Sequence, residues 1–360
     1  MNSYILIFRK KIIFSFVLIL CSLITVDIGL YFYKNIKTTK TTFINEKFSK
    51  IHHFNLNSNE AKDIIFIGSS KTFYQISTNV FKKNNFDIYN FGISGIFFED
   101  YPGLIPSINN VKPKEVIISM SVNEFYNKLP LSRYPSLNEI EYYYGIDKIK
   151  FLKALKQLIV NSHLFLQYSE NIFYRVKSIY EIFDVKKKFN KQANDLNRLV
   201  TNDLNRLSPE ILNNKTFIDE PIYYSKLVNC EVFDIRRIDE YQTILKCSNG
   251  DGVLVGARIK NNNNITKELT KLNQQSVKYL QKLISNIDRE KIKVSIILEP
   301  SLNNTFIYDI NDVKKEFIDI KFIDLTSLKI QDKFWLDNFH LNYKGREYYS
   351  QYLSDLLKLQ

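Results

Sequence analysis

The sequence predicts an α/β fold, a three-layer α/β/α sandwich built around a parallel sheet. Short apolar runs of strand length alternate with longer segments of helical periodicity, which is the pattern of a parallel sheet with helices on both faces. The candidate functional residues follow several of these runs directly, and ligand sites in such sheets form at the carboxyl ends of strands. One membrane-spanning helix is expected before this domain and a largely helical insertion within it.

The first predicted element is a membrane anchor at residues 12–33. This run is apolar apart from Asp27 and is flanked by Arg9-Lys10-Lys11 and Lys34, and about twenty apolar residues suffice to cross a bilayer. A cleaved signal peptide is the alternative, but its apolar region is shorter and a small-x-small cleavage site follows it, which is lacking here. The short basic tail favours a cytoplasmic amino terminus. We therefore expect a single-pass protein of a bacterial cytoplasmic membrane, with its main domain outside.

The remaining elements follow in order. Residues 1–34 contain the anchor, and residues 35–62 are expected to form a polar stalk. Strands are predicted at residues 63–67, 86–91, 115–120, 291–298 and 317–325. Helices are predicted at residues 98–109, 266–287 and 343–357. The sheet domain is therefore expected in two parts, residues 63–127 and 265–360, separated by a mainly helical insertion at residues 128–264 whose last third has a strand-and-turn texture.

Charge and cysteine content limit the possible classes of protein. The net charge of +12 is scattered along the chain without zinc-finger spacing or a basic recognition helix, which argues against nucleic-acid binding. A basic surface also suits an anionic membrane or cell-wall polymer. Cys21 lies in the anchor, whereas Cys230 and Cys247 form either one disulfide in an oxidising compartment or two reduced thiols. No Cys-x-x-Cys pair is present, and we expect no metal ion or cofactor.

Three short segments with candidate chemistry directly follow predicted strands. Ser70 ends Gly68-Ser69-Ser70, where a turn can hold a serine exposed with its backbone amide facing the same space. Gly95 closes the segment after the second strand, where glycine permits close approach of the backbone to a ligand. Asn123 follows the third strand, and its side-chain amide can donate to a developing oxyanion. Taken singly, each is at least as typical of an ordinary strand end, turn or helix cap.

The fourth segment contains Asp337 and His340. Of the four histidines, His340 alone follows the last predicted strand and precedes the final helix. Asp337, three residues earlier, can orient the imidazole and stabilise its charged form. His340 can then take the proton of Ser70, whose hydroxyl is otherwise too weakly acidic to attack as an alkoxide. Ser70, Asp337 and His340 are therefore the predicted catalytic triad.

In their order and their positions at strand ends, the four segments resemble the four sequence blocks of the SGNH (GDSL-like) hydrolase family. The resemblance covers residues 63–126 and 266–357 and implies an SGNH-hydrolase or flavodoxin-like fold. It carries over the same triad and three oxyanion-hole donors, namely the backbone amide of Ser70, Gly95 and Asn123. Ser69 and Glu124 depart from the family pattern, which commonly has Asp at both positions.

The Gly-Ser-Ser form with one anchor is similar to SGNH-like proteins of cell-envelope acylation, such as D-alanine transfer proteins and partners of membrane-bound O-acyltransferases. The resemblance implies a serine esterase or O-acyltransferase acting on acyl esters of a cell-envelope glycan or polymer. A membrane-bound O-acyltransferase is the expected partner. The alternative is a catalytically silent SGNH-like scaffold beside such an acyltransferase, against which the complete triad argues. No residue distinguishes hydrolysis from transfer.

Overall fold

The computed structural model describes six segments of the chain, residues 62–132, 135–162, 220–237, 242–256, 265–302 and 304–359, together with Ser22, Thr25, Lys47, Lys50, Ile51 and Phe54. The chain divides into two compact units. One consists of Met1–Lys40 and Lys156–Phe217, and the other of Thr41–Leu155 and Ile218–Gln360. Nearly all described elements belong to the second unit, which contains the central sheet and every predicted site residue.

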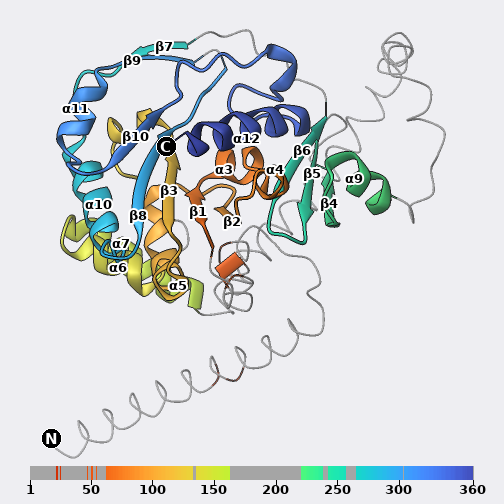
Figure 1. The fold of residues 1–360 in the computed structure, drawn as a ribbon. Helices are drawn as coiled ribbons and strands as arrows, with labels where there is room; N and C mark the ends of the chain where they lie inside the picture. The colour runs from red at the N-terminus through yellow and green to blue at the C-terminus, as the bar shows by residue number, and fades with distance from the viewer. Residues whose placement is uncertain are drawn as a thin grey trace, which may run out of the picture. The chain divides into compact units, whose positions relative to one another are not determined.

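A five-stranded parallel sheet forms the centre of this unit (Figure 1). Its strands are β1 (Ile64–Gly68), β2 (Ile88–Gly92), β3 (Glu115–Met120), β8 (Lys293–Leu298) and β10 (Lys321–Asp324). They lie in the order β10-β8-β3-β1-β2, and all neighbouring pairs are parallel. The chain winds outward in both directions from β1 and β3, so the loops that follow these two strands diverge. Ligand sites in sheets of this kind form at the carboxyl ends of such strands.

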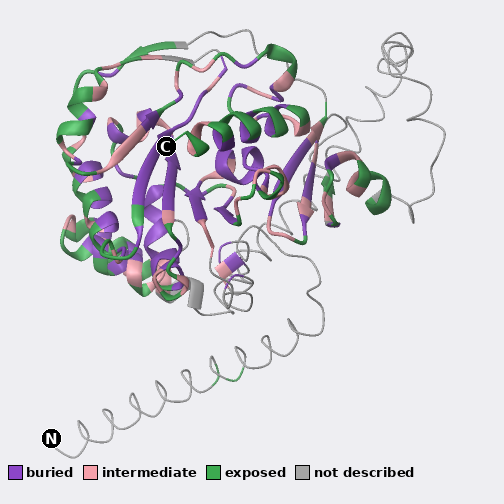
Figure 2. Cartoon of the chain, in the orientation of Figure 1, coloured by how far each residue is buried: buried purple, intermediate pink, exposed green. Residues whose placement is uncertain are grey.

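The strand sequences explain why the sheet is central. All five residues of β1, IIFIG, are buried, and continuous apolar runs are typical of parallel strands covered on both faces. Figure 2 shows the strands of the sheet as largely buried. Phe66 of β1 packs edge-on against Phe81 with 5.2 Å between ring centroids. The same cluster includes Leu353, so this face is covered by helices α4 (Thr78–Lys83) and α12 (Tyr343–Lys358).

Helices and 3₁₀ turns surround the sheet in the described segments. The helices are α3 (Ser70–Gln75), α4 (Thr78–Lys83), α5 (Ile105–Val111), α10 (Gln274–Ser285), α11 (Ile310–Lys315) and α12 (Tyr343–Lys358). The 3₁₀ turns are η1 (Phe98–Leu104), η2 (Val122–Phe125) and η5 (Asp332–Phe334). The fold is therefore of the α/β class with a parallel central sheet, an arrangement compatible with a three-layer sandwich.

The described part of the insertion contains helices and a small antiparallel sheet. Helices α6 (Leu137–Tyr144), α7 (Lys148–Ser162) and α9 (Glu220–Val228) are followed by β4 (Val232–Arg237), β5 (Gln242–Cys247) and β6 (Gly252–Gly256). A disulfide joins Cys230 to Cys247, with 5.8 Å between their Cα atoms. The sequence did not decide between a disulfide and two reduced thiols for Cys230 and Cys247, and the structure pairs them in a disulfide. Residues 163–219 of the insertion lie outside the described residues.

Three predicted elements differ from the structure. The helix predicted at residues 98–109 is instead the 3₁₀ turn η1 followed by α5, which starts at Ile105. The helix predicted at residues 266–287 begins instead with β7 (Ile265–Glu268), which pairs in parallel with β9 (Asn304–Ile307), and α10 starts only at Gln274. Asn273 ends the extended stretch because its side chain accepts the backbone N–H groups of Gln275 and Ser276, which is an N-cap. The strand predicted at residues 317–325 is shorter, since β10 starts at Lys321.

The predicted anchor, residues 12–33, lies outside the described residues except for Ser22 and Thr25. Among the helices that are described, none has the length and apolar character needed to cross a membrane. The predicted stalk, however, contributes buried side chains to the domain. Lys47 pairs with Glu139 of α6 at 2.8 Å, and Lys50 donates to the Asn90 carbonyl at 2.8 Å.

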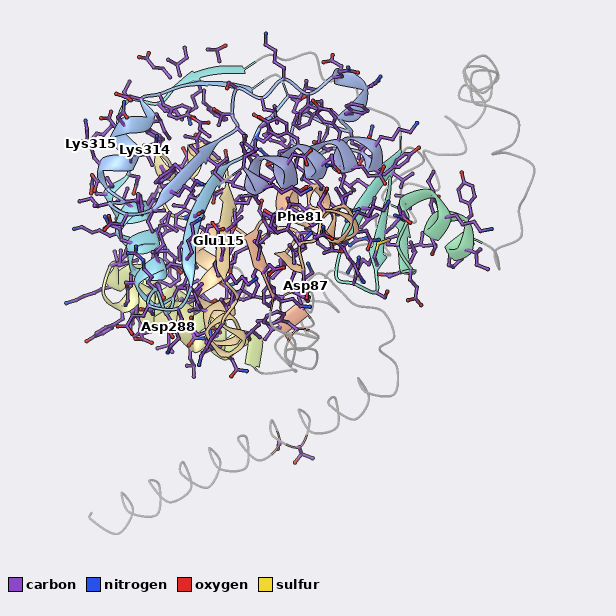
Figure 3. The ribbon with its side chains drawn as sticks, in the orientation of Figure 1. Phe81, Asp87, Glu115, Asp288, Lys314 and Lys315 are labelled. Atoms are coloured by element: carbon purple, nitrogen blue, oxygen red, sulfur yellow. A yellow bond between two sulfur atoms is a disulfide. The ribbon has the colours of Figure 1, made fainter. Side chains whose placement is uncertain are left out.

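The amino ends of the strands carry charged pairs. Lys62 pairs with Asp87 at 2.9 Å, and Lys293 lies 3.8 Å from Glu115. Figure 3 labels Asp87 and Glu115, which precede β2 and begin β3, respectively. These partly exposed pairs sit at the edge of the sheet opposite the strand ends that carry the candidate site, and pairs of this kind contribute little to stability.

Candidate active site

Ser70 is the first residue of α3 and follows the sharp turn at the end of β1. Gly68 is required there, because a Cβ at this position would lie 1.7 Å from Thr72 Oγ1 and 2.9 Å from the Ser119 carbonyl oxygen. The turn therefore brings the start of α3 directly against β1 and β3. It leaves Ser70 half-buried at the carboxyl edge of the sheet.

His340 and Asp337 lie in a closed loop before α12. Trp335 and Leu341 form an antiparallel bridge across its base, and Leu336 N–H donates to the His340 carbonyl at 2.8 Å. Asp337 Oδ1 accepts the backbone N–H groups of Phe339 and His340, each at 2.7 Å. These bonds fix the carboxylate beside the imidazole without help from distant residues.

A continuous hydrogen-bond chain joins the three predicted triad residues. Ser70 Oγ lies 2.9 Å from His340 Nε2, and His340 Nδ1 lies 2.8 Å from Asp337 Oδ2. The carboxylate facing Nδ1 favours the tautomer with a proton there, which leaves Nε2 to accept the serine hydroxyl. Burial acts to raise the pKa of Asp337, but the hydrogen bond and charge of His340 and the backbone donors outweigh it and hold that pKa below its usual value.

Gly95 and Asn123 lie on the two loops beside Ser70. Gly95 follows β2 with a φ of 78°, a conformation that suits glycine and few other residues. Asn123 lies in η2, after β3. Within the described segments, direct hydrogen bonds join Ser70, His340 and Asp337, whereas Gly95 and Asn123 share none with the triad.

Comparison with models of protein families gives no match for this chain, and comparison with curated proteins gives none either. The site must therefore be interpreted from its own geometry.

A buried polar network involves the two residues that follow Ser70. Glu299, at the end of β8, accepts the hydroxyls of Thr72 at 3.1 Å and Ser119 at 2.7 Å on one oxygen. Its other oxygen lies 3.9 Å from the ammonium of Lys71. The network thus joins helix α3, which follows β1, to β3 and to the residue after β8, and it holds the segment around Ser70 in place.

Lys71 also connects this network to the His340 loop. Its ammonium donates to the Pro300 carbonyl at 3.1 Å and lies 5.8 Å from the centre of the Phe339 ring. Burial lowers the pKa of Lys71, and the carboxylates of Glu299, Glu124 and Asp337 offset part of this effect. Lys71, the residue after Ser70, therefore lies among several acidic side chains that favour its charged form.

Two amide side chains fix helix α3 from opposite sides. The buried Asn90 donates to the Ile76 carbonyl at 3.0 Å and accepts the Gly92 N–H at 2.9 Å. Gln75 donates to the Phe339 carbonyl at 2.9 Å. Helix α3, which begins with Ser70, is consequently joined to the β2 loop and to the loop that carries His340.

Glu124 links the two loops that carry the predicted oxyanion-hole donors. Its Oε1 accepts the Ser121 N–H at 3.0 Å, and its Oε2 accepts the Phe98 N–H at 3.4 Å. Burial raises the pKa of this carboxyl to about 7. Glu124 thus connects the Gly95 loop to the Asn123 turn.

The sequence analysis did not identify several residues that support the site. Glu299 directly follows the strand predicted at residues 291–298, and Lys267 lies in the helix predicted at residues 266–287. The sequence indicates no role for Gln75 or Asn90. A polar residue at the carboxyl end of a predicted strand was the available signal for Glu299. In the part of the chain that the structure describes, no group of three or more His, Cys, Asp or Glu residues could hold a metal ion.

Proposed function

We propose that this protein is a membrane-anchored serine O-acyltransferase or esterase of the SGNH type. The hydrogen-bond chain from Ser70 through His340 to Asp337 carries this proposal, because it is the arrangement that nucleophilic acyl chemistry requires. The strand order β2-β1-β3-β8-β10 supports a flavodoxin-like three-layer α/β/α sandwich, with the site at the crevice where that order reverses.

The first half-reaction forms an acyl-enzyme. Ser70 Oγ attacks the ester carbonyl carbon while its proton moves to His340 Nε2. The carbonyl oxygen becomes an oxyanion, for which the Ser70 amide, the Gly95 amide and the Asn123 side chain are the proposed donors. The oxyanion then collapses, the bond to the leaving oxygen breaks, and that oxygen takes the proton from His340.

The second half-reaction reverses these steps with a new acceptor. A water molecule or a sugar hydroxyl gives its proton to His340 and attacks the acyl carbon. Collapse of the second oxyanion breaks the bond to Ser70, which recovers its proton from His340. The product is a free acid when water attacks and a new ester when a hydroxyl attacks, so the same residues serve esterase and transferase.

Two observations support an acyl ester of a cell-envelope glycan or polymer as the substrate. Phe97 and Phe339 are 44% and 47% exposed and adjoin the Gly95 loop and His340, respectively. Half-exposed aromatic rings offer surfaces for an acyl chain or a sugar ring. The disulfide between Cys230 and Cys247 suits an oxidising compartment, in keeping with an anchored domain outside the cytoplasmic membrane. A membrane-bound O-acyltransferase remains the proposed partner.

A serine-directed fluorophosphonate tests the proposal on the full-length protein in detergent. We expect covalent labelling of the wild type and none of Ser70→Ala, with hydrolysis of p-nitrophenyl acetate lost in parallel. Ser69→Ala is the matched control, because Ser69 precedes α3 and makes no hydrogen bond to His340 among the described residues. A folded wild type that is not labelled would contradict catalysis and favour the silent scaffold.

A further inference from the structure

Lys267 of β7 makes a contact that is not explained by the packing of the fold. Its side chain is exposed, and its ammonium donates to Asn123 Oδ1 at 3.1 Å and to Asn127 Oδ1 at 3.3 Å. Asn123 is the one side-chain donor of the proposed oxyanion hole. A cation from a separate element is therefore bonded directly to the group that would receive the developing negative charge.

The chemistry of the two groups fixes the orientation of the asparagine amide. An ammonium has three donors and no acceptor, so it selects the oxygen end of a side-chain amide. With Oδ1 held by Lys267, the Nδ2 end is left as the donor for another partner. Without such a restraint, an amide can present its oxygen in the same place, which would repel an oxyanion.

The surroundings of β7 hold Lys267 at this position. β7 pairs in parallel with β9, with Lys267 opposite Phe306. Downstream of β7, Asn273 N–H donates to the Phe125 carbonyl at 2.8 Å, and Ser276 Oγ donates to the Asn127 carbonyl at 2.9 Å. The segment from β7 to α10 is thus bonded to the same turn that carries Asn123.

We propose that Lys267 is a positioning residue that acts through Asn123. It holds the amide with its Nδ2 donor available to the oxyanion, and its charge polarises that donor. This inference rests on the proposed function, since it assigns a partner to one member of the proposed oxyanion hole. It also assigns a role to the small β7–β9 sheet, which positions the Lys267 ammonium beside Asn123.

The test compares Lys267→Met, Lys267→Arg, Asn123→Ala and the double variant Lys267→Met/Asn123→Ala in full-length protein. Lys271→Met is the matched control, because Lys271 is also exposed, lies shortly after β7 and has no hydrogen bond to Asn123 among the described residues. For each protein we would measure kcat and KM for p-nitrophenyl acetate and the rate of fluorophosphonate labelling.

Lys267→Met is expected to lower kcat by about tenfold with KM nearly unchanged, a smaller loss than that expected on removing the donor itself. Lys267→Arg should retain most of the activity. The double variant should be no slower than Asn123→Ala alone, because the lysine has nothing left to position.

Three outcomes would overturn the inference. In the first, Lys267→Met behaves as Lys271→Met does. In the second, the loss in Lys267→Met falls on KM alone. In the third, the two substitutions reduce kcat independently of each other. An inactive wild type is a different result, since it would overturn the proposed function and with it any role of Lys267 in catalysis.

Discussion

The carboxylate of Asp337 contacts both the side chain and the backbone of His340. One carboxylate oxygen faces Nδ1 at 2.8 Å, and the other accepts the backbone N–H of the same residue at 2.7 Å. An asparagine would keep the backbone bond and the size of the side chain. It would lose the charge that favours the required tautomer and stabilises the imidazolium formed during attack.

Asp337→Asn is therefore expected to lower kcat for p-nitrophenyl acetate by about a thousandfold or more. Thermal stability should change little, because both backbone N–H groups retain an acceptor. Asp312→Asn, at an exposed position on α11, controls for removal of one carboxylate. A loss of activity below tenfold would show that Asp337 has no role as the partner of the base.

The sequence predicted that Ser70, His340 and Asp337 act together, and the structure joins them by hydrogen bonds. Such a set was predictable because it depends on residue type and on order along the chain. His340 is one of four histidines, and its position three residues after Asp337 sufficed to identify the pair. The supporting residues were not predictable in this way. Glu299 contacts Thr72 and Ser119 from a strand far away in the sequence, and such partnerships depend on strand order, which a single sequence does not reveal.

Glu124 offers a second prediction at the level of single residues. Glu124→Gln keeps the shape of the side chain, but one of the two bound N–H groups, at Ser121 or Phe98, must face the new NH₂. Losing one such hydrogen bond costs about 1–3 kcal/mol. Because these bonds hold the loops of Gly95 and Asn123, we expect kcat to fall by about tenfold. Unchanged kcat relative to Glu141→Gln, an exposed control on α6, would contradict this role.

Among the elements, the sheet strands were easier to predict than the small sheets. The strand predicted at residues 115–120 coincides with β3, because a continuous apolar run of this length leaves few alternatives. Residues 265–268 have no such signal. Their extended conformation depends on pairing with β9, almost forty residues later, so the local pattern favoured a helix that begins only after the Asn273 cap.

The segment containing Lys47, Lys50 and Phe54 supports an element-scale prediction. Lys47 and Glu139 are 1% and 0% exposed and form an ion pair at 2.8 Å. Removing one member of a buried pair leaves an uncompensated charge and costs about 3–5 kcal/mol. Lys47→Met should therefore destabilise the protein strongly, and Lys47→Met/Glu139→Gln should recover part of that loss.

Urea unfolding followed by the fluorescence of Trp335, the only tryptophan in the sequence, measures this effect. Lys62→Met is the control, because its partner Asp87 is 53% exposed and such pairs contribute less than about 1 kcal/mol. Equal effects of Lys47→Met and Lys62→Met would mean that the segment before the domain is not docked on α6.

For the molecule as a whole, the disulfide predicts the number of free thiols. With three cysteines in the sequence and Cys230 joined to Cys247, the denatured protein should show one free thiol before reduction and three afterwards. The bond closes a loop with a sequence separation of 17, and closure of a loop of this size contributes about 3 kcal/mol. Reduction should therefore lower the unfolding temperature of the wild type and leave that of Cys230→Ala/Cys247→Ala unchanged.

The free energy of unfolding should also depend on pH because of Glu99, a buried acidic residue outside the triad. Burial, aided by the charge of Asp100, raises the pKa of Glu99 to about 9. Glu124 adds to this effect, whereas Lys150 opposes it. The folded state therefore holds a proton that the unfolded chain releases near its ordinary pKa of about 4.5. Glu99 thus stabilises the fold below pH 4.5 relative to higher pH, and this contribution is lost as the pH rises toward 9.

Urea unfolding between pH 5 and pH 9 tests this prediction. One retained proton corresponds to a slope of about 1.4 kcal/mol per pH unit, and Asp100, whose pKa burial also raises, acts in the same direction. Glu99→Gln stays neutral throughout and should flatten the decline, whereas Glu290→Gln, at an exposed position, should leave it as it is. Equal pH dependence of the wild type and Glu99→Gln would contradict a proton held by Glu99 in the folded protein.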